Sequence, residues 1–202
     1  MRYRDTQQSL KALYSVAATQ GGYFTAKQAA EAGYDYSHLV YHLQARNFER
    51  AAHGLYRLPT IPLAEHDDLI RLSLWSRGQD DAPQGIVSHA SAMFLHQLSD
   101  VLPTKVHLTV PPGFRKVAPR GCVLHKSRLT TAETEAHEGF AVTKPLRTLL
   151  DVARNSSITD EQLERAVHDA ISRGLVRESV LKRELGKVMS PTRRDCFASL
   201  VG

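Results

Sequence analysis

Two short groups of residues in this sequence have types and spacings suited to binding a cation. His38 and His42 stand four residues apart, so on a helix their imidazoles share one face, as two ligands of one metal ion do. The run Glu65-His66-Asp67-Asp68 brings three carboxylates and an imidazole together, and carboxylate oxygens are common ligands of divalent cations. Both groups are therefore candidate metal sites.

Simpler explanations account for both groups. No third ligand follows the two histidines at a recognisable interval, so imidazoles that face solvent or a DNA groove explain the pair better. Carboxylates in the first turn of a helix are stabilised by the helix dipole, which explains the acidic run. The two cysteines, Cys122 and Cys196, lie far apart and form neither a C-x-x-C motif nor a disulfide framework. We expect no metal site and no bound cofactor.

Motifs that catalysis needs are also missing from the sequence. There is no Asp/Glu-x-Lys triplet, which many metal-dependent nucleases use, no G-x-x-x-x-G-K-[ST] phosphate loop and no G-x-S-x-G nucleophile turn. No Gly-Ser dipeptide occurs, which argues against a nucleotidyltransferase. The sequence therefore predicts a protein that binds rather than catalyses, and no catalytic residue is assigned.

Composition and charge favour a cytoplasmic protein with a polyanionic partner. The 202 residues are 42% hydrophobic and 23% charged, which suits a globular chain with a buried core. The formal net charge is +5 and the isoelectric point is about 9.3, and Lys and Arg contacts to phosphates supply much of the affinity for nucleic acids. No signal-type apolar region follows Met1. Residues 86–103 lack Lys and Arg but contain histidines, serines and an aspartate, so no membrane association is expected.

Helical patterns fill the first 46 residues. An apolar stripe predicts a first helix from about residue 6 to 19, which Gly21-Gly22 ends. Thr25-Ala-Lys-Gln28 is a capping-box pattern that opens a short second helix ending before Gly33. After a tight turn, Ser37 is suited to cap a third helix that runs to about Arg46. Three helices with a short turn between the last two are typical of a helix-turn-helix.

A hairpin follows the third helix directly. Residues 48–58 contain two β-prone arms around His53-Gly54, where glycine can take the positive φ of a tight turn. A hairpin in this place is the wing of a winged helix-turn-helix. Two prolines in the run Leu58 to Ala64 then mark a domain boundary. We expect a DNA-binding domain over residues 1–60 and a second domain over residues 61–202.

These elements predict which side chains contact DNA. The exposed face of the third helix enters the major groove, so we expect its side chains to reach base edges. The wing adds cations near the backbone or the minor groove, and the start of the second helix favours a phosphate. The predicted contacts are Ser37, His38, Tyr41 and His42 at bases with Gln44 and Arg46 further along, Tyr36 at sugar or phosphate, Arg50, His53 and Arg57 on the wing, and Thr25, Lys27 and Gln28 at a phosphate.

The second domain mixes helices and strands, so the predicted fold class is α+β: a winged helix-turn-helix followed by a mixed α/β domain that ends in helices. The loop from Phe114 to Arg120 is basic and is either solvated or in contact with nucleic acid. Helices are expected at about 63–77, 90–98, 144–154, 159–173, 177–187 and 193–200, and strands at 105–110 and 122–126.

Several segments together resemble one family, the AbiEi-type antitoxins. The most specific is the Thr-x-x-x-Arg-Thr-Leu-Leu-Asp run from Thr143 to Asp151, and the resemblance spans about residues 10 to 155. The other segments are 21–33, 50–58, Val87-Ser-His-Ala-Ser-Ala92 and Val106-His-Leu-Thr-Val110. Two sets of polar residues in these segments, Ser88-His89 and Arg147-Thr148 with Asp151, are functional candidates, although a cap and an i, i+4 ion pair explain them structurally.

The resemblance implies an antitoxin that represses its own operon. Its winged helix would bind inverted repeats in the promoter, and its second domain would neutralise a nucleotidyltransferase-like toxin without a stable complex. Whether two copies pair on the DNA stays open, although half-site repeats would favour such pairing. Two other functions stay open from the residues alone. One is a winged helix that recognises a protein or RNA instead of an operator, and the other is a nucleic-acid-processing enzyme.

Overall fold

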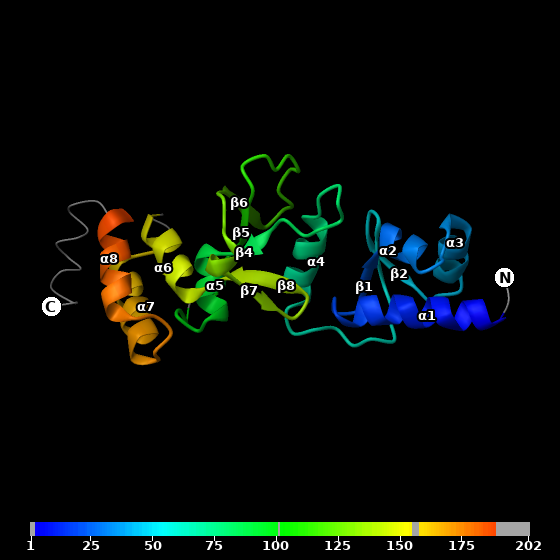
Figure 1. Ribbon diagram of the computed structural model, residues 1–202, viewed down its shortest axis with the longest axis horizontal. Helices are drawn as coiled ribbons and strands as arrows, with labels where there is room; N and C mark the ends of the chain where they lie inside the picture. The colour runs from blue at the N-terminus through cyan, green and yellow to red at the C-terminus, as the bar shows by residue number, and fades with distance from the viewer. Residues whose placement is uncertain (1–2, 101, 155–157, 189–202) are drawn as a thin grey trace. The chain divides into compact units, whose positions relative to one another are not determined.

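The computed structural model describes residues 3–100, 102–154 and 158–188, and it has the α+β fold that the sequence predicts (Figure 1). Helices with a small antiparallel sheet come first, a mixed five-stranded sheet follows, and helices end the described chain. The chain divides into two compact units, Met1–Gln84 with Ala136–Phe140, and Gly85–Glu135 with Ala141–Gly202. Residues 61–84 belong to the first unit, and a functional division near residue 60 stays a prediction.

The first unit holds the predicted three helices and hairpin. β3 is the central strand of the small sheet, whose order is β1-β3-β2, and both of its neighbours are antiparallel to it. Three helices followed by such a hairpin are the architecture of a winged helix-turn-helix. The elements are α1 (Tyr3–Ala18), β1 (Tyr23–Thr25), α2 (Ala26–Glu31), α3 (Tyr36–Gln44), β2 (Glu49–Ala52) and β3 (Leu55–Arg57).

An aromatic cluster joins the helices of this unit to its sheet. Phe24 of β1 meets Phe48 edge-on, with ring centroids 5.1 Å apart, and stacks on Tyr56 of β3 at 5.8 Å. Tyr34, from the turn before α3, meets Phe48 at 5.5 Å. Aromatic rings bury more apolar area than other side chains, so the cluster holds α3 against the sheet. The core around it is aliphatic and includes Leu13, Ala17, Ala29, Leu39 and Leu58.

A fourth helix, α4 (Asp67–Trp75), packs in the first unit. Ile70 lies over Gly21, where an added Cβ would come within 2.7 Å of the Ile70 Cδ1. Gly21 also has a φ of +60°, so a side chain there would meet both backbone strain and a steric clash. The Tyr23 hydroxyl donates to Asp67 Oδ2 at 3.0 Å. The Gly21-Gly22 pair therefore both ends α1 and makes room for α4.

The second unit contains most of the mixed sheet of order β6-β5-β4-β8-β7, whose β7–β8 turn, Ala136–Phe140, is grouped with the first unit. β4 is antiparallel to β5 and parallel to β8, and β5 is parallel to β6. The expected strands at 105–110 and 122–126 are confirmed, and because they are parallel, residues 111–121 form a crossover rather than a hairpin turn. The strands are β4 (Ile86–Val87), β5 (Val106–Val110), β6 (Cys122–Lys126), β7 (Thr134–His137) and β8 (Phe140–Thr143).

Helices on this sheet supply most of the core of the second unit. Leu149 and Val152 of α6 pack in one buried cluster with Leu163 and Leu181, which come from the two helices that follow (Figure 1). The helices are α5 (His89–Leu95), the single 3-10 turn η1 (Thr131–Glu133), α6 (Pro145–Arg154), α7 (Asp160–Ser172) and α8 (Glu178–Val188). The helix expected near 193–200 and Cys196 lie outside the described residues. Within the described ranges, no helix is long and apolar enough to cross a membrane.

Candidate nucleic-acid interface

The helix α3 exposes one polar face. Leu39 is buried against the core, while Tyr41 is 63% exposed and Ser37 and Gln44 are exposed beside it. These three residues follow each other at i, i+4 and i+7, so they form one row on the outer side of the helix. Tyr36, at the first turn, is 80% exposed. Of the predicted base contacts on this helix, Ser37, Tyr41 and Gln44 are therefore exposed.

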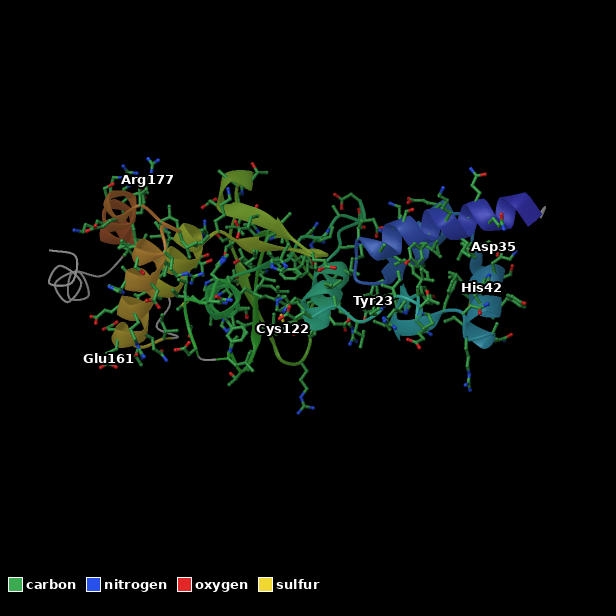
Figure 2. The ribbon with its side chains drawn as sticks, turned by 90° about the horizontal axis from the view of Figure 1, so that it is seen from below. Tyr23, Asp35, His42, Cys122, Glu161 and Arg177 are labelled. Carbon is green, nitrogen blue, oxygen red and sulfur yellow. The ribbon has the colours of Figure 1, made fainter. Side chains whose placement is uncertain are left out.

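The start of α3 is held by an aspartate. The Asp35 carboxylate accepts the backbone N–H of His38 at 2.9 Å and the hydroxyl of Ser37 at 2.6 Å. Asp35 and His42, near the two ends of this helix, are labelled in Figure 2. Asp35 is thus the N-cap, and the prediction that Ser37 caps this helix is wrong. Asp competes with Ser for this role because both present an oxygen to the free amides of the first turn. The Ser37 hydrogen bond, followed by the His38 amide, lowers the pKa of the Asp35 carboxyl.

Two histidines on α3 have different surroundings. His38 is partly exposed, and its Nδ1 lies 3.3 Å from Asp35 Oδ1. His42 stacks on Phe48 with ring centroids 4.6 Å apart, and its Nδ1 is 3.1 Å from the Asn47 side-chain amide. Burial, with a smaller effect of His38, lowers the pKa of His42. His42 is therefore a neutral ring that fixes the end of α3 on the aromatic cluster, whereas His38 stays partly open to solvent.

The wing presents an exposed cation next to its turn. Arg50 on β2 is exposed, and its Nη2 lies 3.5 Å from the Nδ1 of His53, which is also exposed. Gly54 completes the turn with a φ of +68°, as the sequence predicts. Its carbonyl accepts the backbone N–H of Ala26 at 3.0 Å. The tip of the wing is therefore tied to the first residue of α2.

Arg57 is used differently from Arg50. Its side chain is only 12% exposed, its Nη2 donates to the carbonyl of Ile61, and its Nη1 lies 3.5 Å from Glu49 Oε2. A guanidinium held by a carbonyl and a carboxylate has few donors left for a phosphate. The structure thus places Arg57 in the fold of the sheet rather than on its outer surface.

The start of α2 is occupied by protein groups. The predicted capping box is confirmed: Thr25 Oγ1 accepts the Gln28 N–H at 3.2 Å, and Gln28 Oε1 accepts the Thr25 N–H at 2.9 Å. The buried Arg77 donates to Gln20 and Gln28, and Asp81 Oδ2 accepts the Thr25 hydroxyl at 3.2 Å. Only Lys27 is exposed here. Thr25 and Gln28 thus hold α2 to the segment after α4, and Lys27 is the one predicted contact of this turn on the surface.

The polar residues of the Thr143–Asp151 run hold the second unit together. The Thr148 hydroxyl donates to the Thr143 carbonyl at 2.9 Å, which joins the end of β8 to the first turn of α6. Arg147 Nε lies 2.9 and 3.0 Å from the two oxygens of Asp151, and its other nitrogens donate to Glu133 and Ser127. Each nitrogen of the Arg147 guanidinium therefore has a protein partner, which supports the structural explanation of this run.

The second unit contains a cluster of three histidines, His89, His107 and His125, which the sequence analysis did not predict. The rings of His89 and His125 stack with centroids 3.5 Å apart, and His107 Nδ1 is 3.0 Å from His125 Nε2. Ser88 Oγ lies 3.0 Å from His89 Nδ1 and accepts the Thr109 hydroxyl at 2.8 Å. In the part of the chain that the structure describes, no group of three or more His, Cys, Asp or Glu side chains has an arrangement that would hold a metal ion.

Comparison with known proteins supports a regulator domain in the first unit. Residues 11–59 match a family model described as a transcriptional regulator, AbiEi antitoxin. No curated protein shows a significant match to the sequence. Among solved structures, the RV2827C protein from Mycobacterium tuberculosis is 17% identical with a TM-score of 0.48, covering 95% of this chain and 81% of that one. Residues 11–59, in the N-terminal region of this chain, thus match the transcriptional-regulator domain of the AbiEi antitoxin family.

Proposed function

We propose that this protein represses its own operon by binding inverted repeats in the promoter, and that it neutralises a nucleotidyltransferase-like toxin encoded with it. In this proposal the protein is not an enzyme and needs no cofactor or metal. It acts in the cytoplasm, two copies bind side by side on the repeats, and it forms no stable complex with the toxin. The match of residues 11–59 to the AbiEi regulator family supports the assignment to this class.

One observation carries the DNA-binding part of the proposal. The row of Ser37, Tyr41 and Gln44 on α3 is exposed, polar and free of the core, and the same unit presents the exposed Arg50 and His53 on its wing. A helix that enters the major groove needs hydrogen-bonding side chains on its outer face, and a wing needs cations for the backbone. Residues 1–60 also carry seven Lys or Arg and four Asp or Glu, a balance that suits a phosphate-lined partner.

The structure suggests two roles among the thirteen predicted contact residues. Four of these side chains have contacts inside the unit and position the rest in this proposal: Thr25, Gln28, His42 and Arg57. Side chains that are at least partly exposed contact the DNA in this proposal: Lys27, Tyr36, Ser37, His38, Tyr41, Gln44, Arg46, Arg50 and His53. Base reading is assigned to the row on α3, and phosphate contacts to Lys27, Arg50 and the flanking Arg46.

Fluorescence anisotropy with the full chain and its promoter DNA tests this division. Replacing Tyr41 with Ala should reduce discrimination between operator and mutated operator by about 1–3 kcal/mol. Tyr14 on α1 is 50% exposed and provides a matched control, so Tyr14→Ala should bind both DNAs as the unaltered protein does. Equal discrimination by Tyr41→Ala and the unaltered protein would exclude the assigned base contact. Binding to RNA or protein with no affinity for promoter DNA would favour the alternative interaction module.

The antitoxin part of the proposal concerns the second unit. Its fold is stabilised by buried polar contacts around Arg147 and Asp151, which are separate from the α3 and wing surface. Co-expression of the toxin with the full chain should restore growth, and so should co-expression with Tyr41→Ala, because the substitution affects only promoter recognition. Loss of rescue by folded Tyr41→Ala would contradict this separation of roles.

A further inference from the structure

The second unit contains a small hollow that neither DNA binding nor the core explains. It has a volume of about 210 Å³ and lies between α5, the segment after it, the start of β5 and the start of α7. A cavity of about 150 Å³ is large enough for benzene, so this hollow has room for a single or fused heteroaromatic ring. Its lining residues include Ala90, Met93, Leu102, His107, Ile158 and Gln162.

His107 is a polar residue in the lining of this hollow. Its Nδ1 is engaged with His125 Nε2 at 3.0 Å, and among the described residues no hydrogen bond involves its Nε2. Burial, followed by the neighbouring His125 and Lys105, lowers the pKa of His107, so the ring is neutral at pH 7. A neutral imidazole whose Nδ1 shares a hydrogen bond presents at Nε2 either a donor or an acceptor, according to the tautomer of the pair. It can therefore hydrogen-bond to a ring nitrogen or a ring N–H.

Gln162 and the apolar walls complete the ring site. Gln162 Oε1 accepts the Thr159 backbone N–H at 3.0 Å, which fixes the side chain and leaves its amide N–H groups as donors. Met93 is 1% exposed and belongs to the core of the unit, so it backs the apolar wall of the hollow. Leu102 on the other wall is 68% exposed, so a ring bound in the hollow would cover part of it. The hollow thus combines apolar walls with hydrogen-bonding groups at two points.

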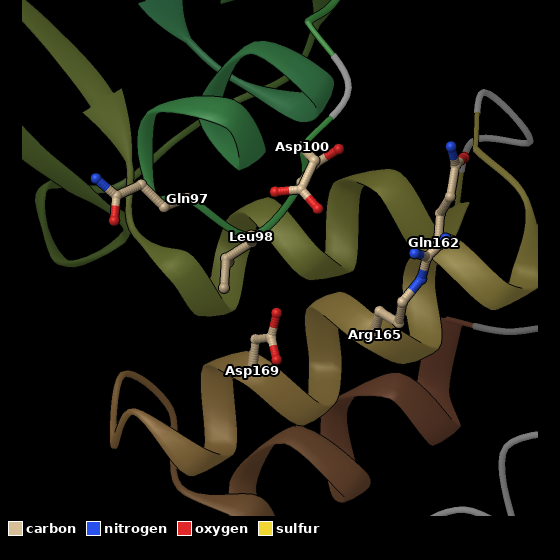
Figure 3. Close-up of a pocket in the computed structure, with 7 residues that line it drawn as sticks. Gln97, Leu98, Asp100, Gln162, Arg165 and Asp169 are labelled. Carbon is tan, nitrogen blue, oxygen red and sulfur yellow. The ribbon is translucent and has the colours of Figure 1, made fainter.

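A second, smaller hollow adjoins the first and is acidic. It has a volume of about 80 Å³ and shares Ser99 and Gln162 with the larger one (Figure 3). Asp100 and Asp169 line it from the turn after α5 and from α7, together with Arg165. Carboxylates accept hydrogen bonds from sugar hydroxyls, as the acidic residue of dinucleotide-binding sites does for a ribose. Two carboxylates against one guanidinium disfavour a phosphate.

We propose that the two hollows form one site for an uncharged ribonucleoside, with its base against His107 and Gln162 and its ribose hydroxyls on Asp100 and Asp169. This site is independent of promoter binding, because all its residues belong to the second unit. The ligand has both a flat, hydrogen-bonding ring and a neutral diol, and each hollow matches one of these parts. Occupation of the site stabilises the fold of the second unit.

Titration of the full chain with adenosine, guanosine, cytidine and uridine, followed by NMR of ¹⁵N-labelled histidine, tests the proposal. We expect at least one nucleoside to shift the His107 ring signals with a dissociation constant of about 0.1 mM, the range set by typical ligand efficiency for a molecule of this size. The matching 2′,3′-dideoxynucleoside should bind about tenfold more weakly, because it lacks the hydroxyls that would donate hydrogen bonds to Asp100 and Asp169.

Three variants of lining residues and one control variant separate this site from general effects on the fold. Ala90→Leu fills the ring hollow and Thr104→Trp covers it from an exposed position, so either should weaken binding at least about tenfold. Asp169→Asn should remove the preference for the ribonucleoside, whereas Glu164→Gln on the same helix, which does not line the hollows, should leave binding unchanged. The proposal is overturned if no nucleoside at 10 mM, about a hundred times the expected dissociation constant, shifts the His107 ring signals. It is also overturned if Thr104→Trp and Asp169→Asn are folded and bind the nucleosides as tightly as the unaltered protein.

Discussion

The imidazole rings of His89 and His125 lie face to face, with centroids 3.5 Å apart and 14° between their planes. His107 extends the pair through its hydrogen bond to His125. His89 is 7% exposed and has a φ of +52°, a left-handed conformation that few residues other than glycine adopt without strain. Rings this close repel each other when protonated, so the arrangement requires neutral imidazoles at its centre.

The stability of the second unit should therefore depend on pH. Burial, followed by repulsion from His125 and His107, lowers the pKa of His89 to about 3. Between pH 6.5 and 3 the unfolded chain takes up a proton at His89 that the folded chain does not, so stability is full above pH 6.5 and is lost as the pH falls. At pH 5 the loss from His89 alone should be about 2 kcal/mol relative to pH 7.5, measured by urea unfolding.

Substitution of His89 checks the source of this dependence. Asn tolerates positive φ but does not titrate, so His89→Asn should reduce the loss between pH 7.5 and pH 5 by about 2 kcal/mol. His168→Asn is a suitable control, because its side chain is 82% exposed. An unchanged pH profile for His89→Asn would place the titrating groups elsewhere.

The contacts of Arg147 with Asp151, Glu133 and Ser127, here called the Arg147 clamp, give a second prediction. Burial raises the pKa of the Asp151 carboxyl despite the opposing effect of Arg147. The two contacts of 2.9 and 3.0 Å from Arg147 Nε are those expected of an ionised carboxylate. Arg147→Met leaves that carboxylate buried without its partner, which should cost about 3–5 kcal/mol in urea unfolding at pH 7. Arg154 also approaches Asp151, at 3.6 Å, but is 49% exposed. Arg154→Ala should therefore cost at most about 1 kcal/mol, and equal costs would contradict the clamp.

Local patterns predicted the winged helix because each of its elements has its own signal within a few residues. The capping box at Thr25 and the turn at Gly54 are confirmed for this reason. The cap of α3 was predicted wrongly, because Asp35 and Ser37 are both good caps and only the path of the chain decides between them. Burial of Arg57 and His42 depends on Ile61 and Phe48, contacts that periodicity does not reveal.

The histidine cluster was beyond prediction for a different reason. Its members come from α5, β5 and β6, and they meet only because β5 and β6 are parallel neighbours with His125 opposite Thr109. His107 and His125 each lie on a strand that the sequence predicts, but the sequence does not show that these two strands pair or in which direction. It therefore gives no sign that the two side chains meet. The hollows beside His107 likewise require the start of α7 to pack near α5, which is a property of the tertiary fold.

Thr25 and Lys27 provide a third prediction, because they are neighbours with different roles. Thr25→Ala removes the cap of α2 and should cost about 1 kcal/mol of stability without changing the salt dependence of DNA binding. Lys27→Ala should leave stability within about 0.5 kcal/mol and reduce the slope of log K against log salt by about 0.9. Urea unfolding and anisotropy at several salt concentrations measure the two effects. A reduced slope for Thr25→Ala would show that its hydroxyl also contacts a phosphate.

Arg50 and Arg57 give the sharpest contrast on the wing. They lie on adjacent strands, yet Arg50 is exposed beside His53, whereas Arg57 is held by the Ile61 carbonyl and Glu49. Arg50→Ala should therefore bind promoter and unrelated DNA equally more weakly, with a salt slope smaller by about 0.9 and unchanged stability. Arg57→Ala should instead lower the free energy of unfolding by about 1–3 kcal/mol, because it leaves the part-buried Ile61 carbonyl without its donor. At temperatures where Arg57→Ala stays folded, it should keep the full salt slope. The reverse pattern, a stable Arg57→Ala with a reduced slope, would mean that Arg57 leaves Glu49 on binding and that the wing rearranges on DNA.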